Sequence, residues 1–299
     1  MAQHQFKTTI GGQALIEGVM MRGPSQTAVA VRRPDGDITC RVTKNRSWTE
    51  KHPLFSLPFV RGAVKLLEAM VVGTEALTYA ASFWEEEAEE SPAEKIKEFG
   101  LVAFSILLAV GIFIVIPSAL ASVLGRFTSS SFLLNIVDGI LRFLFFFIYL
   151  GIISRMKEIQ RVFEYHGAEH KSIFCYEQGE ELTVENVRKF PKEHPRCGTS
   201  FLFMVLAISI LTLSVFGWPN ALVRIILRIV LLPVIAGIAY EINRLVGKYD
   251  TPLCRVLRGP GLLIQHFATV REPDDAQIEV AITSLKAVLP REGESDLWT

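Results

Sequence analysis

The chain has 299 residues, of which 50% are hydrophobic and 20 are phenylalanines. Lysine plus arginine and aspartate plus glutamate both number 31, so the formal net charge is zero. A composition this apolar argues against an ordinary soluble globular protein. The balanced charge argues against electrostatic attraction to nucleic acid. We therefore expect an α-helical integral membrane protein and no direct DNA binding.

The first 60 residues are polar and contain alternating patterns typical of β-strands. Residues 27–32 and 38–42 alternate on either side of Pro34-Asp35-Gly36, which predicts a β-hairpin. The stretch 12–21 predicts one further strand of the same small sheet. No apolar core of signal-peptide length follows the N-terminus, so we expect this region to stay in the cytosol.

A helix with a broad apolar face is predicted next, over residues 60–83, and such a helix can lie along a membrane surface. The acidic run 85–92 ends in a proline and predicts a solvated linker.

Four apolar stretches follow, and a bilayer about 30 Å thick needs about 20 helical residues to be crossed. The first stretch, residues 101–125, contains no charge. The other three are residues 131–154, 200–216 and 221–245, and polar loops or turn signals separate the stretches from one another. We expect four transmembrane helices, arranged as two hairpins.

Charged residues inside these stretches allow two interpretations. Asp138 and Arg142 share a face of the second helix, and Arg224 and Arg228 share a face of the fourth. Paired charges would hold the bundle together, and unpaired ones would mark an ion or substrate path.

Lysines and arginines are concentrated outside the apolar stretches, with 12 in residues 1–98, eight in 154–199 and six in 247–299. The positive-inside rule then places both termini and the central loop in the cytosol. The chain divides into six regions: a cytosolic β-rich segment (1–60), an amphipathic helix and acidic linker (61–98), a first transmembrane hairpin (99–153), a cytosolic loop (154–199), a second transmembrane hairpin (200–246) and a cytosolic C-terminal region (247–299). The cytosolic segments together would form a small α+β domain, and Gly259-Pro260-Gly261 predicts a loop or re-entrant turn within it.

The central loop carries the sequence Tyr-His-Gly-Ala-Glu-His-Lys at 165–171, which we expect to be helical. His166 and His170 are four residues apart, so they share one helical face and can offer two nitrogens to one ion. The order His-x-x-Glu-His is that of inverted zincins, in which the glutamate serves a metal-bound water. The pattern predicts a divalent metal site, with zinc as the expected ion and Glu169 as the catalytic residue. The alternative is a pair of packed histidines that bind no metal, because such histidines can have the same spacing.

The third metal ligand is open at this point. A hydrolytic zinc site usually has three protein ligands and one position left for water. His194 or Cys197, directly before the third apolar stretch, could complete the site. Glu241 is the other candidate, because inverted zincins take a glutamate from a later helix, and Asp250 and His266 are more distant alternatives.

Three segments resemble hallmark segments of the bacterial YqhQ-like proteins: GGQALIEGVMMRGP (11–24), YHGAEHKSIFCYE (165–177) and HPRCGTSF (194–201). That family is described as uncharacterised multipass membrane proteins, sometimes labelled as predicted metal-dependent enzymes. The resemblance covers nearly the whole chain and implies a bacterial inner-membrane location. It also implies that any metal chemistry rests on a small set of residues: His166, Glu169, His170, His194 and Cys197.

Three functional hypotheses follow. The first is a metal-dependent membrane hydrolase that attacks a bond in a protein or lipid-linked substrate at the cytosolic side. The second is a non-catalytic scaffold or membrane-protein assembly factor, whose basic cytosolic residues dock a membrane-biogenesis partner or a ribosome. The third is a transporter, motivated by the charged residues within the apolar stretches.

Overall fold

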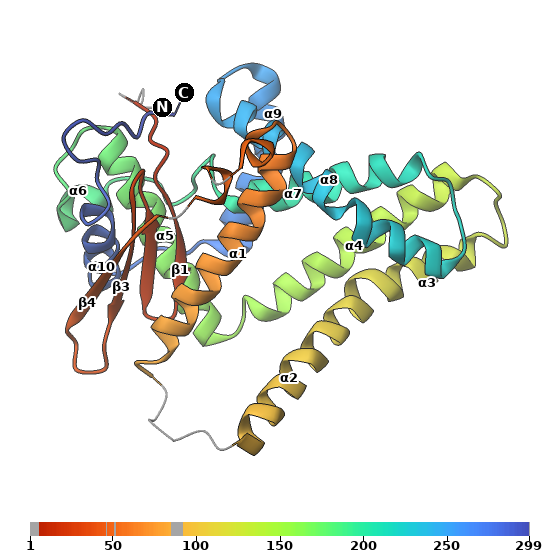
Figure 1. Cartoon of the computed structure of the whole chain (residues 1–299), viewed down its shortest axis with the longest axis horizontal. Helices are drawn as coiled ribbons and strands as arrows, with labels where there is room; N and C mark the ends of the chain where they lie inside the picture. Colours follow the sequence, from red (N-terminus) through yellow and green to blue (C-terminus); the bar gives the residue numbers. More distant parts are fainter. Residues whose placement is uncertain (1–5, 46, 51, 85–91, 299) are drawn as a thin grey trace.

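A computed structural model describes residues 6–45, 47–50, 52–84 and 92–298. A small unit of sheet and helices lies at one end, and long helices extend away from it (Figure 1). Residues 85–91 of the predicted acidic linker lie outside the described residues, and Pro92 begins a helix.

The four strands form an antiparallel sheet in the order β1-β2-β3-β4. They are β1 (Gly11–Leu15), β2 (Gly18–Arg22), β3 (Gln26–Arg32) and β4 (Ile38–Lys44). The predicted hairpin around Pro34 is confirmed as β3 and β4, in which Val29 lies opposite Arg41.

The prediction of a single strand over 12–21 is wrong, because the chain turns at Ile16 and Glu17 and forms β1 and β2. Glu17 takes a positive φ of 48°, which is uncommon for a residue with a side chain. Its carboxylate accepts hydrogen bonds from Arg161 and from the Tyr165 hydroxyl (3.1 Å), and these contacts hold the turn in place. The two central positions of this turn hold neither Gly nor Asn, and Gly18 follows them as the first residue of β2.

Helices cover both faces of the sheet. Val19, Met21 and Ala28 pack against α5 (Lys157–Glu177) and α10 (Asp275–Lys286). On the opposite face, Met20 and Val29 pack against α1 (Val60–Ala81). The central strands β2 and β3 are therefore buried on both sides, as their nearly continuous apolar sequence requires.

The predicted helix over 60–83 is α1 (Val60–Ala81), which runs from the sheet to the apolar helices. Gly62 of α1 faces Gly237, where an added Cβ would lie 2.2 Å from the carbonyl oxygen of Phe59. The absence of a side chain at Gly237 thus lets the two backbones meet. Beside this crossing, both carboxylate oxygens of Glu241 accept hydrogen bonds from Arg61, each at 2.6 Å.

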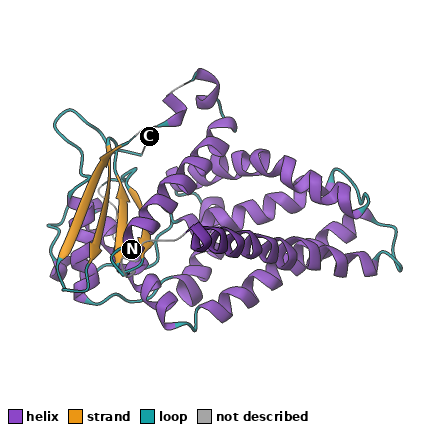
Figure 2. Ribbon diagram, turned by 60° about the horizontal axis from the view of Figure 1, so that its bottom comes forward, coloured by secondary structure: helices purple, strands orange, loops and turns teal. Residues whose placement is uncertain are grey.

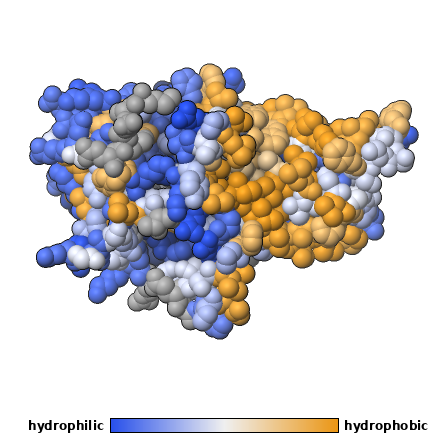
Figure 3. All heavy atoms as spheres, turned by 90° about the horizontal axis from the view of Figure 1, so that it is seen from above, coloured by the Kyte–Doolittle hydropathy of each residue, from blue (hydrophilic) through white to orange (hydrophobic). Residues whose placement is uncertain are grey.

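Within the described part of the chain, three helical segments are long and apolar enough to cross a membrane, and a fourth apolar helix is shorter. Figure 3 shows apolar residues covering this part of the molecule and polar residues gathered at the other end. The long segments are Gly100–Leu124, Ser131–Ile153 (α4) and Ala221–Lys248 (α8), and the shorter helix is α7 (Gly198–Ser214). The first of them comprises the end of α2 (Pro92–Val110), a π-helical turn (Gly111–Val115) and α3 (Ile116–Leu124).

The charged side chains inside these helices lie together. Arg142 donates to Asp138 from Nε (2.9 Å), and Arg228 of α8 donates to the same carboxylate (2.7 Å). A second bond from Arg142 reaches the carbonyl oxygen of Ile114 in the π-helical turn (3.3 Å). One carboxylate thus joins α4, α8 and the first apolar segment.

Of the remaining elements, α6 (Val184–Arg188) packs on α5 and α10 beside the sheet, whereas α9 (Pro252–Ile264) packs on α7 and α8 (Figure 2). The remaining elements also include two short 3-10 helices (Trp48–Glu50 and Pro53–Ser56) and a π-helical turn (Gln265–Thr269). The predicted loop at Gly259-Pro260-Gly261 is wrong, since all three residues lie in α9. Gly261 packs against α7, and its added Cβ would lie 2.2 Å from the Ser200 hydroxyl, so the glycine serves close helix packing instead of a turn.

Candidate metal centre

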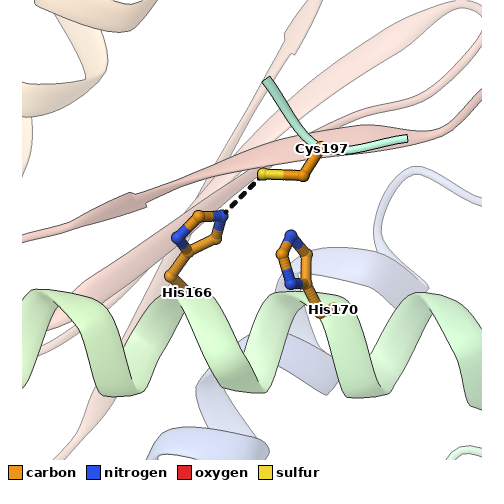
Figure 4. A group of neighbouring side chains, drawn as sticks. All are labelled: His166, His170 and Cys197. Carbon is orange, nitrogen blue, oxygen red and sulfur yellow. Dashed lines mark hydrogen bonds between the residues drawn. The ribbon is translucent and has the colours of Figure 1, made fainter. Parts of the chain in front are cut away.

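Three side chains that commonly bind metals converge where the sheet unit meets the apolar helices. His166 and His170 rise from one face of α5, and Cys197 reaches toward them from the residue that begins α7 (Figure 4). One ligand atom from each residue lies within 4.8 Å of the other two. The helical spacing predicted from the sequence thus brings the two imidazoles together.

Each histidine uses its Nδ1 atom to hold its ring in place. Nδ1 of His166 is 2.9 Å from the carbonyl oxygen of Thr269, and Nδ1 of His170 is 2.6 Å from that of Lys192. A carbonyl can only accept, so both Nδ1 atoms carry a proton, and Nε2 is the atom through which each ring can bind a metal. Metal-binding histidines show this arrangement, in which a backbone carbonyl fixes the tautomer and the ring orientation.

Cys197 provides the third donor atom. Its Sγ lies 3.2 Å from Nε2 of His166 and accepts a hydrogen bond from the backbone N–H of Thr199 (3.5 Å) at the start of α7. Burial alone would raise the pKa of this thiol, but His170 and Thr199 outweigh burial and lower the pKa. These groups thus shift the thiol toward the thiolate, which is the form that binds a metal.

Glu169 lies beside the cluster and is held by the sheet. Its Oε1 accepts a hydrogen bond from the backbone N–H of Gly12 in β1 (3.0 Å), and no described residue donates to Oε2. A Cβ on Gly12 would lie 2.4 Å from the carbonyl oxygen of Met20 and 3.0 Å from Cδ of Glu169. Only glycine therefore lets β1 approach the carboxylate this closely.

Burial sets the protonation of the two innermost residues. His170 is 2% exposed, and its burial lowers its pKa to about 4. Glu169 is 5% exposed, and its burial raises its pKa to about 7. Near neutral pH the imidazole is neutral and able to bind a metal, while the carboxyl group is able both to take up and to release a proton.

The cluster opens into a cavity of about 370 Å³. Its walls come from β1, from α5, from the loop before α7 and from Trp298 near the C-terminus. The cavity leaves room beside the three donor atoms for a small group that approaches Glu169.

His194 and Glu241 lie outside the group of three donor atoms. His194 accepts a hydrogen bond at Nδ1 from the backbone N–H of Arg196 (3.3 Å), and its Nε2 lies 3.8 Å from the Glu177 carboxylate. Its backbone forms two hydrogen bonds with the side-chain amide of Gln265, at 2.8 and 3.0 Å. His194 thus positions the loop that carries Cys197, while both oxygens of Glu241 are bonded to Arg61.

The geometry of the three donors fits a tetrahedral metal. Zinc binds nitrogen at about 2.0–2.1 Å and sulfur at about 2.3 Å, which places neighbouring ligand atoms roughly 3.3–3.8 Å apart. The separation of 3.2 Å between Sγ of Cys197 and Nε2 of His166 is close to this value. Small side-chain rotations would bring all three donors into range, with one position left open toward the cavity.

Sequence reasoning missed the residues that position the site. Thr269 and Lys192 act through backbone carbonyls, and a backbone contact leaves no residue-type signal. Gly12 was marked by its residue type, because the glycines of the segment 11–24 predict close backbone approach. Gln265 could have been noticed, because a buried amide next to a polar motif needs partners for both of its ends.

The fold and the site define a helical protein with apolar segments of membrane-spanning length and a two-histidine, one-cysteine cluster. A family profile described as "Protein of unknown function (DUF1385)" matches residues 57–291. The chain is also 32% identical over 309 residues to "Uncharacterized protein YqhQ" of Bacillus subtilis (strain 168), across 99% of this chain and 97% of that protein. The chain therefore belongs to this family, as its three sequence segments predicted. No solved structure shows significant similarity to it.

Proposed function

We propose that His166, His170 and Cys197 bind a divalent transition metal, zinc in the first place, and that the protein is a metal-dependent hydrolase. The observation that carries the proposal is the pair of Nδ1 hydrogen bonds to the carbonyl oxygens of Thr269 and Lys192. These bonds leave both Nε2 lone pairs facing the same space as the Cys197 sulfur. A buried imidazole N–H needs an acceptor in any case, so these bonds support a metal site because they turn both Nε2 atoms toward a buried thiol.

Glu169 supplies the proton chemistry in this proposal. A bound zinc polarises substrate oxygens and lowers the pKa of coordinated water. Glu169 would accept a proton from the attacking water and pass it to the leaving group. The N–H of Gly12 fixes one carboxylate oxygen for this task.

The position of the cluster suggests where the substrate lies. Cys197 is the N-cap residue of the apolar helix α7, whereas α5 packs against the sheet. The cavity is therefore placed where a polar unit meets apolar helices, and a protein or lipid-linked substrate at a membrane surface could enter it.

Glu169→Gln is the direct test of this function. The amide keeps the size of the side chain and an oxygen for the N–H of Gly12. We expect the variant to bind as much zinc as the wild type and to lose at least about a hundredfold in hydrolysis. The probes are fluorescence-quenched peptides and a fluorescent phospholipid in detergent micelles. Glu158→Gln, an exposed position on the same helix, is the matched control. Full activity of Glu169→Gln, or no hydrolysis of either probe by the zinc-loaded wild type, would refute the proposal.

We infer further that the three long apolar segments and α7 cross the bacterial inner membrane, with both termini in the cytosol. At about 1.5 Å per residue, the 17 residues of α7 span about 26 Å, slightly less than a bilayer core. Cys40 on β4 is exposed and provides a natural reporter. A membrane-impermeant maleimide should label Cys40 only after the cells are lysed, and should label a Ser129→Cys variant in the turn before α4 in intact cells. The reverse pattern would contradict this topology.

The scaffold and transporter hypotheses are alternatives. An assembly factor would work without metal and would crosslink to nascent membrane proteins or to ribosomes. The paired charges of Asp138, Arg142 and Arg228 favour a structural role over a path for a transported ion.

A further inference from the structure

The apolar helices carry more positive than negative charge at the end farthest from the sheet. Residues 100–154 and 198–240 contain a single acidic residue, Asp138, and four arginines at 126, 142, 224 and 228. Asp138 bonds to Arg142 and Arg228, so its one negative charge is already shared between two guanidinium groups.

Arg224 is buried without an acidic partner among the described residues. It is 9% exposed and donates to the hydroxyl of Ser122 (2.9 Å) and to the carbonyl oxygen of Pro219 (3.1 Å). Its guanidinium carbon also lies 4.1 Å from the centre of the Trp218 ring. These contacts fix the orientation of the group but leave its charge uncompensated, which is costly in an apolar setting.

A cavity of about 400 Å³ lies beside this arginine, between α3 and α8. Its polar lining consists of Ser118, Ser122, Arg126 and Arg224, and the rest of its lining is aliphatic. Arg126 is exposed and makes no ion pair with any described residue. Two cations and two hydroxyl groups therefore face one space that also has an apolar wall.

We propose that this cavity binds the phosphate group of an anionic phospholipid. Guanidinium groups hold phosphate oxygens through paired, charge-assisted hydrogen bonds. The Ser118 hydroxyl, which accepts from Arg228, has its own proton left to donate, whereas Ser122 donates to the carbonyl oxygen of Ser118. The aliphatic wall suits the start of an acyl chain. Arg126 lies in the turn after α3, and Arg224 lies on the first turn of α8, so both are close to the helix ends opposite the sheet (Figure 1). Phospholipid headgroups are found at this level when these helices cross a bilayer. This site is independent of the metal cluster at the other end.

Native mass spectrometry of the detergent-purified full-length protein tests the proposal. The probes are phosphatidylglycerol, phosphatidylcholine with the same acyl chains, and inorganic phosphate. We expect the wild type to retain phosphatidylglycerol in preference to the other two, and Arg126→Gln to weaken that binding by about fivefold, since each basic residue near a lipid surface contributes about 1 kcal/mol. Arg155→Gln, an exposed arginine after α4, is the control and should bind like the wild type.

Arg126 is exposed, so its replacement should leave the fold intact, and Arg224→Gln provides a second variant with a larger expected loss. Equal phosphatidylglycerol binding by the wild type and Arg126→Gln would overturn the proposal. Preferential retention of inorganic phosphate would overturn the lipid assignment and point to a soluble anion.

Discussion

The thiol sulfur of Cys197 lies 3.2 Å from Nε2 of His166, although 31 residues separate them in the chain. The contact joins α5 of the sheet unit to the first residue of an apolar helix. Each of the two residues is held by further hydrogen bonds, from Thr199 to the sulfur and from the imidazole to Thr269. The cluster therefore depends on the surrounding residues that hold it.

Gly12→Ala should damage the site without changing a ligand. The new Cβ would lie 2.4 Å from the carbonyl oxygen of Met20, so β1 must shift and the N–H that holds Glu169 must move with it. We expect a loss of roughly 1–3 kcal/mol in stability, measured by thermal unfolding in detergent, together with reduced hydrolysis. Gly11→Ala is the neighbouring control, because no atom lies within 4 Å of its added Cβ. Equal melting temperatures for the two variants would contradict the close approach of β1 to Glu169.

Gln265→Leu should loosen the loop that carries Cys197. The Gln265 side chain is fully buried and makes two hydrogen bonds with the backbone of His194, so the apolar replacement leaves buried backbone groups without partners. We expect a cost of about 1–3 kcal/mol and a zinc affinity about 10- to 100-fold weaker, measured by competition with a chelating dye. His266→Ala, at the next position, is exposed and should leave both quantities unchanged. Normal zinc affinity in Gln265→Leu would show that this pair does not position the ligand.

Arg196→Met should destabilise the fold through its partner. Arg196 is paired with Glu177, and the two side chains are 6% and 0% exposed. Without Arg196, the buried Glu177 carboxylate loses its main counter-charge, which lowers the free energy of unfolding by about 3–5 kcal/mol. The double variant Glu177→Gln/Arg196→Met should recover a large part of this loss in denaturant unfolding. Additive losses from the two single variants would indicate that the pair is not coupled.

The sequence predicted the apolar helices well because their signal is local. Ser131–Ile153 and Ala221–Lys248 begin at the predicted positions, where a serine and an asparagine cap the helix ends. The pairing of His166 with His170 followed from helical periodicity alone. Each of these inferences needed only residues that are neighbours along the chain.

The third ligand, the turn at Ile16 and Glu17, and the helix over residues 259–261 depend on contacts that the sequence does not mark. Cys197, His194 and Glu241 were all candidates for the third ligand, and hydrogen bonds from residues distant in the chain separate them: Gln265 holds His194, and Arg61 holds Glu241. The turn at Ile16 and Glu17 carries no turn residue, because Arg161 and Tyr165 stabilise it from α5. Gly259-Pro260-Gly261 has the composition of a loop, yet packing against α7 keeps it helical.

Elemental analysis of the detergent-purified protein tests the central claim most directly. The samples are the wild type, His166→Ala/His170→Ala and the exposed-histidine control His266→Ala, with folding checked by size-exclusion chromatography. The account predicts close to one transition-metal ion, zinc in the first place, per wild-type and control chain and a loss of that metal in the double variant. Well-folded wild type that holds no zinc, manganese or iron, even after each is added back, would contradict the metal site and favour the scaffold hypothesis.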